Sequence, residues 1–478
     1  MLSIPGVKQL TEAFVRVTFF DQFVGADTAE SSISLLETLR KENTGCLFAY
    51  SVEVDEKEAA GKTSKGKAKQ PVYKRIVQEM IHSIDVAADF EDKHLPPGSS
   101  QGRRTWVAVK LSALLPRHQA LMNLSKYLVK HRPSIPIAFP GTPDASDLDI
   151  LYKPSVDAAE DLTEQDVIDL RDLRADLDAI CKKARERGVR IIIDAEHTWY
   201  QPAIDALTLS MMIKYNKLPD RSSTVPAVQP LVYNTYQAYL RRTPEHLAHG
   251  LEAAKAGGYV LGVKLVRGAY HSQETATHNA AKAGKSSRSI SPDALPPVWP
   301  TKPETDACYN ACARTLLDAI AADITCPRRT RSWRSLVGWG SKASEADKTS
   351  VPTVGVLFGT HNWESCRLIL DELVKRGLAA PEGVTPDGEA VIRIRTAVTE
   401  RLTLAQLYGM HDNLTHYLVD RTRSSAPFVI KYVPYGSLSE VMPYLSRRAV
   451  ENKSVLSEGA AADERQRAWS EIRRRMFG

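Results

Sequence analysis

Short apolar runs alternate with longer amphipathic stretches along most of the chain, from residue 46 to residue 432. Such alternation is typical of parallel strands that are joined by crossover helices. Eight runs have strand character, and they begin at Cys46, Trp106, Val189, Pro230, Tyr259, Thr353, Leu402 and Pro427. Eight strands with intervening helices predict an α/β fold, a (β/α)8 barrel of the TIM type, in which functional side chains lie at the C-terminal ends of the strands.

One crossover helix is specified in detail. Its apolar residues recur at spacings of three and four, at Val167, Leu170, Leu173, Leu177 and Ile180. Thr163 stands where an N-cap is needed, and Gly188 stands where a helix can end in a left-handed conformation. We therefore predict a helix between Thr163 and Gly188, followed at once by the strand that begins at Val189.

The pattern divides the chain into three parts. We expect a helical N-terminal arm over 1–43, a catalytic barrel over 44–452 and a basic C-terminal tail over 453–478. Four stretches rich in Pro, Gly, Ser or charge interrupt the barrel pattern and predict surface insertions. These stretches lie near 55–70, 133–160, 275–303 and 327–350.

Composition narrows the class of protein. The 478 residues are 43% hydrophobic and 25% charged, which is ordinary for a globular chain. A net charge of +6 over this length is far from the basic surface of a nucleic-acid-binding protein, so we expect no nucleic-acid partner. The six cysteines form no Cys-x-x-Cys pair and no Cys/His ligand spacing, which predicts neither a metal site nor a disulfide framework and indicates a reducing compartment.

Membrane-spanning and common nucleotide-binding signals are missing from the sequence. No apolar run approaches the roughly 20 residues that cross a bilayer, so we expect any membrane contact to be peripheral. The opening residues have neither the order of a secretory signal nor the composition of a transit peptide. GKT at Gly61 lacks the upstream Gly of a Walker loop, and no Gly-x-Gly-x-x-Gly follows a strand. A dinucleotide, if bound, would have to be held by the barrel itself.

The strongest chemical signal lies in the segment 432–452, YVPYGSLSEVMPYLSRRAVEN. On a helix, four of its side chains share one face, those of Tyr444, Arg447, Arg448 and Glu451. Two guanidinium groups beside a carboxylate and a phenol form a clamp that suits a planar carboxylate. The alternative is a solvated helix face with intrahelical salt bridges.

Proline in the same segment predicts a break. Pro443 is unfavourable inside a helix because it has no amide hydrogen. We therefore expect SLSE from Ser437 to form its own capped turn, with a second helix that restarts so that Pro443 lies in its first turn.

Charged residues also mark the ends of strands. Asp194 closes an apolar strand where a barrel places active-site groups, although a carboxylate at this point is also typical of an N-cap for the next helix. Lys110 and Lys264 lie in or at the end of apolar strands, where a buried ammonium is costly without an anion. We interpret both lysines as partners of an anionic ligand or of acidic side chains.

Two turns that follow strands carry further signals. GVKLVRGAY places Arg267, Gly268 and Tyr270 after a buried strand, a composition that suits phosphate or ring contacts. THN places His361 after another apolar strand, where a lone histidine is more often structural than functional.

Together these segments resemble the proline dehydrogenase family, whose members are flavin-dependent distorted (β/α)8 barrels. The matching strings occur in the expected order between residues 15 and 452. They are VRVTFFDQFVGA, VKLSAL, IIIDAE, YNTYQAYLRR, VKLVRGAYHSQE, FGTHN, LAQLYGM and KYVPYGSLSEVMPYLSRRAVEN. A single string would be weak evidence, but eight in order are specific.

The resemblance implies a substrate site and a cofactor site. Arg447 and Arg448 would bind the carboxylate of proline with help from Lys110. The remaining substrate pocket would come from Asp194, Leu407, Tyr432, Tyr444 and Glu451. FAD contacts would come from Asn234, Gln237, Lys264, Arg267, Gly268, Ala269, Tyr270, Thr360, His361 and Asn362. Some relatives have Arg where Lys264 stands and Trp where His271 stands.

The resemblance also implies a reaction. L-proline would be oxidised to Δ1-pyrroline-5-carboxylate by hydride transfer to FAD, and activity would rise toward alkaline pH because hydride leaves more readily from a neutral amine. Relatives pass the electrons to a membrane quinone. The eukaryotic-looking KLVRGAY and the long insertions suggest a mitochondrial protein, on the matrix side of the inner membrane. Peripheral membrane contact would involve the segment from Cys326 (CPRRTRSWRSLVGWG) or the tail from Glu464 (ERQRAWSEIRRRMFG), although both are also typical of solvated faces.

Three alternatives stay open at this point. Lys110, Lys264 and Lys431 on barrel strands permit a Schiff-base lyase or aldolase. A hydroxyproline dehydrogenase is the second alternative, although in this family Tyr at the position of Tyr432 is associated with proline and a small residue with hydroxyproline. A membrane-associated scaffold with a remnant pocket is the non-enzymatic alternative.

Overall fold

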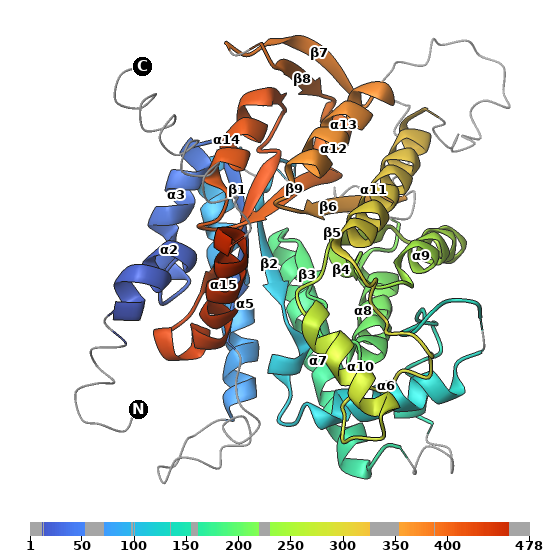
Figure 1. The fold of residues 1–478 in the computed structure, drawn as a ribbon. Helices are drawn as coiled ribbons and strands as arrows, with labels where there is room; N and C mark the ends of the chain where they lie inside the picture. The colour runs from blue at the N-terminus through green and yellow to red at the C-terminus, as the bar shows by residue number, and fades with distance from the viewer. Residues whose placement is uncertain are drawn as a thin grey trace, which may run out of the picture.

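The structure is a computed structural model, shown as a ribbon in Figure 1. It describes residues 12, 14–52, 71–96, 99, 101–133, 135–153, 161–218, 230–325, 353–386 and 388–457, with the side chains of the last helix as far as residue 449. The insertions that we predicted at 55–70 and 327–350, and the tail beyond residue 457, lie outside this part of the chain.

Eight parallel strands close into a barrel at the centre of the molecule. They are β1 (Thr44–Tyr50), β2 (Thr105–Val109), β3 (Ile191–Ile193), β4 (Val232–Gln237), β5 (Leu261–Val266), β6 (Val354–Gly359), β9 (Leu402–Leu407) and β11 (Val429–Tyr435). Around the barrel they follow the order β1, β11, β9, β6, β5, β4, β3 and β2. Each of the eight predicted runs overlaps one of these strands, so the predicted (β/α)8 barrel is confirmed.

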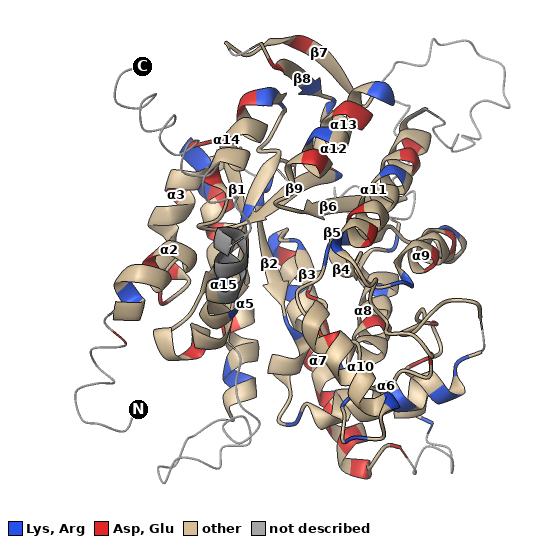
Figure 2. Cartoon of the chain, in the orientation of Figure 1, with Lys and Arg blue, Asp and Glu red and all other residues tan. Residues whose placement is uncertain are grey.

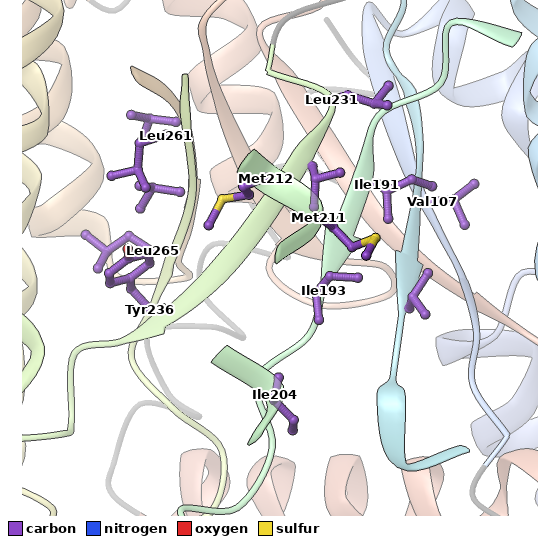
Figure 3. Close-up of a cluster of buried hydrophobic side chains, with 14 of the residues drawn as sticks. Val107, Ile191, Ile193, Ile204, Met211, Met212, Leu231, Tyr236, Leu261 and Leu265 are labelled. Atoms are coloured by element: carbon purple, nitrogen blue, oxygen red, sulfur yellow. The ribbon is translucent and has the colours of Figure 1, made fainter. Parts of the chain in front are cut away.

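Both faces of the barrel strands are buried, which is why the strands are continuous apolar runs in the sequence. One face fills the barrel interior, where Leu47, Trp106 and Tyr233 belong to one apolar cluster. The other face packs against the surrounding helices. Figure 3 shows this outer layer, in which side chains of β2 to β5 meet those of α8 (Gln201–Tyr215), with Val107, Ile191, Ile193, Ile204, Met211, Met212, Leu231, Tyr236, Leu261 and Leu265 labelled.

Helices surround the barrel in the part of the chain that the structure describes. Those with eight residues or more are α3 (Ile33–Lys41), α5 (Val72–His94), α6 (Gln119–His131), α7 (Glu164–Arg187), α8, α9 (Thr243–Gly257), α10 (His271–Lys282), α11 (Lys302–Thr325), α12 (Trp363–Lys375), α14 (Asp412–Arg421) and α15 (Leu438–Ser457). Shorter turns are η1 (Arg16–Phe20), α2 (Asp21–Phe23), η2 (Glu30–Ser32), η3 (Leu111–Leu114), η4 (Asp149–Leu151) and α13 (Thr396–Thr399).

The helix α7 confirms the prediction made for Thr163 and Gly188. The Thr163 hydroxyl accepts the Asp166 amide N–H at 3.1 Å, and the Asp166 carboxylate accepts the Thr163 amide N–H at 3.1 Å. Gly188 ends the helix with φ of +66°, a left-handed conformation that glycine adopts without a side-chain clash.

A small second sheet was not predicted. It has three strands, β7 (Ala379–Val384), β8 (Ala390–Ile394) and β10 (Thr422–Arg423), in the order β10, β8, β7, and β7 and β8 project at the top of Figure 1. Most of β7 is exposed and the strand contains Pro381. The sequence of β7 therefore has neither the alternation of apolar and polar residues nor the apolar run that indicates a strand.

The predicted break at Pro443 is wrong, because α15 is one helix from Leu438 to Ser457 with Pro443 inside it. The capping part of the prediction is confirmed: the Ser437 hydroxyl donates to the Glu440 carboxylate at 2.7 Å, and the Ser437 amide N–H donates to the same oxygen at 3.1 Å. Pro443 is the sixth residue of the helix, so only the helical hydrogen bond to the Ser439 carbonyl is lost. The helix that carries Tyr444, Arg447, Arg448 and Glu451 therefore continues without a break.

The described part of the N-terminal arm packs directly against α15. Phe20 and Phe23 share an apolar cluster with Val441, Tyr444 and Leu445 of that helix. In Figure 1 the helix α2 lies to the left of α15, and the turn η1 that precedes α2 contacts α15. The arm therefore supports the helix that carries the predicted arginine pair.

Two insertions are at least partly described, those near 133–160 and 275–303. The second contains α10 and a loop that folds back onto the turn after β4, where the Trp299 amide N–H donates to the Tyr239 carbonyl at 2.7 Å and Arg241 Nε donates to the Pro296 carbonyl at 2.7 Å. The domain boundaries themselves stay a prediction.

Charges are spread over the outer helices rather than gathered on one face in the view of Figure 2. Many are paired between helices, as when Lys74 of α5 bridges Asp172 and Asp176 of α7 at 2.8 and 2.7 Å. In the described ranges we find no helix that is long and apolar enough to span a bilayer.

Candidate functional site

A cavity of about 510 Å³ opens at the C-terminal ends of the barrel strands. Of the predicted site residues whose side chains the structure describes, all but Asn234 line it. The lining residues are Leu47, Lys110, Asp194, Ala195, Thr235, Gln237, Lys264, Val266, Arg267, Gly268, Ala269, Tyr270, Lys302, Gly359, Thr360, His361, Asn362, Ala405, Gln406, Leu407, Tyr432, Tyr444, Arg447 and Arg448. Strand ends and α15 thus bring together residues that lie more than 300 positions apart.

Asp194 is at the centre of a buried polar group on one wall of the cavity. Its Oδ1 accepts Lys264 Nζ at 2.6 Å, and its Oδ2 accepts the Tyr432 hydroxyl at 3.0 Å. The ammonium of Lys264 also lies 5.2 Å from the centroid of the Tyr432 ring. Burial, followed by the charge of Asp194, raises the pKa of Tyr432 well above its usual value, so the phenol stays protonated and donates.

Asp194 does not cap the helix that follows β3. The helix after β3, α8, begins at Gln201, and its N-cap residue is Tyr200. Asp194 instead uses its two carboxylate oxygens on Lys264 and Tyr432, which come from β5 and β11. The acidic partner that we expected for Lys264 is therefore Asp194.

Helix α15 covers the cavity with two cations. Arg447 and Arg448 both line it, and Arg448 is 6% exposed. The Arg448 guanidinium lies 5.2 Å from the centroid of the Tyr444 ring, which also lines the cavity. The prediction from helical spacing that Tyr444, Arg447 and Arg448 share one face is therefore confirmed, because all three side chains line the cavity. Glu451 lies on the same helix, but its side chain is outside the described part.

The turn after β5 forms a second wall. Arg267 donates from Nε to Asp306 at 2.5 Å, from one terminal nitrogen to the Thr360 hydroxyl at 2.6 Å and from the other to the Ser365 hydroxyl at 2.8 Å. Gly268 has φ of +124°, and a Cβ there would approach the Tyr239 ring to 2.5 Å. The glycine is required because the backbone of this turn lies directly on an aromatic ring.

The residues of THN have two structural roles as well as a place in the cavity wall. Asn362 caps α12 by accepting the Ser365 amide N–H at 2.8 Å. His361 accepts the Leu407 amide N–H at Nε2 at 3.0 Å, so its ring proton is on Nδ1. That Nδ1 is buried and has no hydrogen-bond partner among the described residues. Burial, then the nearby His411, lowers the pKa of His361 well below its usual value, so the ring is neutral.

Gln237, at the end of β4, supplies an acceptor in the cavity wall. Its Nε2 donates to the Glu196 carbonyl at 3.3 Å and to the Tyr239 hydroxyl at 3.2 Å. Its Oε1 is buried and finds no donor in the part of the protein that the structure describes. Among the described residues, two residues of the cavity wall therefore each have one neutral hydrogen-bonding atom without a protein partner, the donor His361 Nδ1 and the acceptor Gln237 Oε1.

Two predicted residues are placed elsewhere. Asn234 is on β4 with Gln237, but it faces the outer side of the barrel and donates from Nδ2 to Asp205 at 3.0 Å. Successive strand residues point to opposite faces, so Thr235 and Gln237 line the cavity and Asn234 does not. Lys431, which we considered as a Schiff-base lysine, donates to Asp412 at 2.8 Å and to the Met410 carbonyl at 3.2 Å and does not line the cavity.

Sequence reasoning missed several lining residues. Lys302, at the start of α11, reaches the cavity and pairs with Asp306 at 2.7 Å, which in turn pairs with Arg267. Its only sequence signal is the Thr301/Glu304 capping pattern that marks a helix start. Gln406 lines the cavity and accepts the Thr415 hydroxyl. We find no cluster of three potential metal ligands in the described ranges.

Comparisons with known proteins agree with this architecture. Residues 36–460 match the model of the family described as Proline dehydrogenase. Proline dehydrogenase 1, mitochondrial, of Homo sapiens is 32% identical over 314 residues, 66% of this chain and 40% of the human protein. Proline dehydrogenase 2, mitochondrial, of Arabidopsis thaliana is 27% identical over 98% of this chain and 80% of the plant protein.

A solved structure gives the same fold. Proline utilization A (PutA) from Bdellovibrio bacteriovorus matches with a TM-score of 0.59 at 17% identity, over 94% of this chain and 34% of that chain. This chain therefore spans less than half the length of the animal relatives and about a third of the solved bacterial protein. The family match covers most of the residues, including every strand of the barrel, and the chain belongs to the proline dehydrogenase family.

Proposed function

We propose that this protein oxidises L-proline to Δ1-pyrroline-5-carboxylate and that it uses FAD as the hydride acceptor. The observation that carries the proposal is the shared cavity of Arg447, Arg448, Lys110 and the Asp194 group. These side chains come from α15 and from the ends of β2 and β3, so only the folded barrel brings them together. The family to which the chain belongs supports proline as the substrate.

The residues present fit a flavin dinucleotide. The unused donor His361 Nδ1 and the unused acceptor Gln237 Oε1 suit a ligand that carries both kinds of hydrogen-bonding group. The backbone of Gly268 lies in the cavity wall, and Arg267, which donates to Ser365 in the first turn of α12, supplies a positive charge there that favours phosphate. When bound, FAD supplies a two-electron acceptor that no amino-acid side chain can provide.

The protein's own groups would bind and orient the substrate. Arg447 and Arg448 form charge-assisted hydrogen bonds to the carboxylate, which fixes one end of the amino acid. Tyr432 limits the space at the ring because its hydroxyl is held by Asp194 at 3.0 Å. Fixing the ring in this way contributes to rate through proximity and orientation. The ring amine must lose its proton before oxidation, so activity should rise toward alkaline pH.

Electron transfer onward and location belong to the same proposal. The curated relatives are named mitochondrial, which supports a mitochondrial location for this chain. We place the protein as a peripheral protein on the matrix side of the inner membrane, with a quinone as electron acceptor. The segments from Cys326 and Glu464 that we proposed for membrane contact lie outside the described residues.

One anaerobic experiment tests the central claim. The purified protein is loaded with FAD, and its absorbance spectrum is recorded before and after addition of L-proline. We expect the flavin absorbance to bleach with proline and to bleach far more slowly with pyrrolidine, which lacks the carboxylate. A protein that binds FAD without bleaching by proline would contradict the substrate, and equal bleaching by pyrrolidine would contradict the arginine clamp.

The lyase alternative receives less support. Of the three lysines that it could use, Lys431 does not line the cavity and Lys264 is engaged by Asp194. Borohydride trapping of a carbonyl substrate on the protein would favour the lyase.

A further inference from the structure

The loop after β3 contains a second carboxylate, Glu196, two residues beyond Asp194. Glu196 is 7% exposed and does not line the cavity. Its Oε1 accepts the Ser112 amide N–H at 3.0 Å, and its Oε2 accepts the Ser112 hydroxyl. Ser112 lies two residues beyond Lys110, in the turn η3 that begins directly after it. Glu196 therefore fixes the backbone that carries Lys110.

Glu196 is also held by the neighbouring strand end. Its carbonyl accepts Gln237 Nε2 at 3.3 Å, which directs the side chain of Gln237. Its amide N–H donates to Gln201 Oε1 at 3.1 Å, and Gln201 in turn donates to Asp205 at 2.8 Å. Asp205 is fully buried and pairs with Arg242 at 2.7 Å. Glu196 thus joins the ends of β2, β3 and β4. Through Gln201 it is also linked to the buried ion pair of Asp205 and Arg242.

We infer that Glu196 is a positioning residue that sets Lys110 for contact with a substrate carboxylate. The inference rests on the proposed function, because it takes Lys110 as one of the groups that bind that carboxylate. Lysine is a flexible chain whose charged end is placed largely by its own backbone and neighbours. A buried carboxylate that holds Ser112, two residues after Lys110, restricts where the ammonium can lie, and small displacements at such sites reduce binding and rate strongly.

The other end of β2 provides a matched control. Glu91 is fully buried and accepts the Arg104 amide N–H at 3.1 Å and the Thr105 hydroxyl at 2.6 Å, at the start of the strand. Like Glu196, it accepts one backbone N–H and one hydroxyl at an end of β2, but it accepts both through one oxygen, which also pairs with Arg40. Because Glu91 lies at the N-terminal end of the barrel, its loss should affect stability without affecting ligand binding.

The experiment measures binding of cyclopentanecarboxylate, a proline-shaped acid that has no ring nitrogen, to the FAD-loaded protein by calorimetry. We expect E196A to weaken binding about tenfold, because Lys110 is displaced. E196Q keeps an acceptor for the Ser112 N–H and should restore most of the affinity. E91A should lower the thermal midpoint and leave the affinity unchanged. Unchanged affinity in E196A, or an equal loss in E91A, would overturn the inference.

A double-mutant cycle shows whether Glu196 acts through Lys110. K110M, E196A and the double variant are compared with the wild type, and S112A gives a milder change if the alanine at 196 prevents folding. We expect E196A to add little loss in the K110M background, because the displaced group is already absent. Additive losses would show that Glu196 acts independently of Lys110 and would overturn the inference.

Failure of the proposed function is distinguishable from failure of this inference. If the wild-type protein does not bind cyclopentanecarboxylate at all, the carboxylate site is wrong. A crystal structure of E196A then decides the positioning role by itself: Lys110 displaced from its wild-type place supports that role, and Lys110 unmoved overturns it.

Discussion

The two ends of the barrel both contain buried arginine, but they use it differently. At the N-terminal end, Arg104 donates to the Pro427 carbonyl at 2.8 Å, Arg190 to the Glu400 carbonyl at 3.1 Å and Arg401 to the Val354 carbonyl at 3.0 Å. At the C-terminal end, Arg447 and Arg448 line a cavity. Arginines of the first kind join chain segments, whereas those of the second kind line a cavity, where we propose that they bind the substrate carboxylate.

The difference shows that residue type and burial do not identify a functional group. Arg104 is fully buried, and burial lowers its pKa to about 10, yet its neighbours are backbone carbonyls and Glu400. Arg448 is similarly buried but faces space that a ligand can enter. In a TIM-type barrel the two ends separate these roles, with stability at one end and chemistry at the other.

The largest expected effect comes from removing the cavity arginines. Each charge-assisted hydrogen bond to a carboxylate contributes about 1.5–3 kcal/mol, so R447M/R448M should lower kcat/KM for L-proline by about 10²–10⁴-fold. Steady-state kinetics with FAD-loaded protein measure the loss, and thermal unfolding serves as the control. A loss below tenfold would remove the clamp from the proposed mechanism.

The opposite result is expected at the N-terminal end. Arg401 pairs with Asp323, and the two side chains are 8% and 9% exposed. R401M leaves Asp323 buried without its cation, which should lower the free energy of unfolding by about 3–5 kcal/mol. Denaturant unfolding measures this, and kcat/KM of the folded protein should stay within twofold of wild type. Adding D323N to R401M should recover part of the lost unfolding free energy. A large loss of kcat/KM in R401M would show that arginines at the N-terminal end of the barrel also affect catalysis.

Acid should destabilise the protein through two buried histidines. Burial lowers the pKa of His361 at the cavity and of His246 behind β4 well below the usual value, so both are neutral when folded. The unfolded chain takes up protons below about pH 6.5, and the folded chain does not. Stability is therefore complete above that pH and should fall by about 1.4 kcal/mol per pH unit and per histidine below it.

Substitution separates the two histidines. In H246N the fall of the unfolding free energy below about pH 6.5 should be less steep by about 1.4 kcal/mol per pH unit, the contribution of one histidine. The value of kcat/KM should change little, because His246 does not line the cavity. In H361N the pH dependence of the unfolding free energy should fall by the same amount, and the affinity for FAD should also fall. Identical pH slopes in wild type and H246N would show that His246 is not neutral in the folded protein.

The smallest effect is expected at the start of α7, where Thr163 does not line the cavity. Thr163 caps α7 through a reciprocal pair of hydrogen bonds with Asp166. T163A should cost about 1 kcal/mol of unfolding free energy, measured by denaturant titration, and should leave kinetics unchanged. T163S keeps the hydroxyl and should be close to wild type; a loss in T163S as large as in T163A would show that the cap bond is not the cause.

Much of the fold could be predicted because its signals are local. The run that begins at Val189 became β3, and the spacing around Leu170 became α7, since burial of both strand faces and a capped amphipathic stripe are visible within a few residues. The second sheet could not be predicted, because β7 is exposed and contains Pro381, so its strand character comes only from pairing with β8.

The candidate site divides in the same way. Helical spacing in the sequence placed Tyr444, Arg447 and Arg448 on one face, and the structure brings that face to the cavity. Nothing local indicated that Lys302 would reach the same place from the start of α11. Glu196 was also visible only as one more acid at a strand end, since its partner Ser112 is 84 residues away.

The sequence by itself determined where the barrel strands and the main helices lie and which charged residues stand at their ends, because these follow from periodicity and caps over short distances. Tertiary structure decided which way those residues face. Both faces of β4 are buried, so only barrel closure shows that Gln237 faces the cavity and that Asn234 faces Asp205. Tertiary structure also showed that α15 continues through Pro443, in a stretch of the helix where Phe20 and Phe23 of the N-terminal arm pack against Val441, Tyr444 and Leu445.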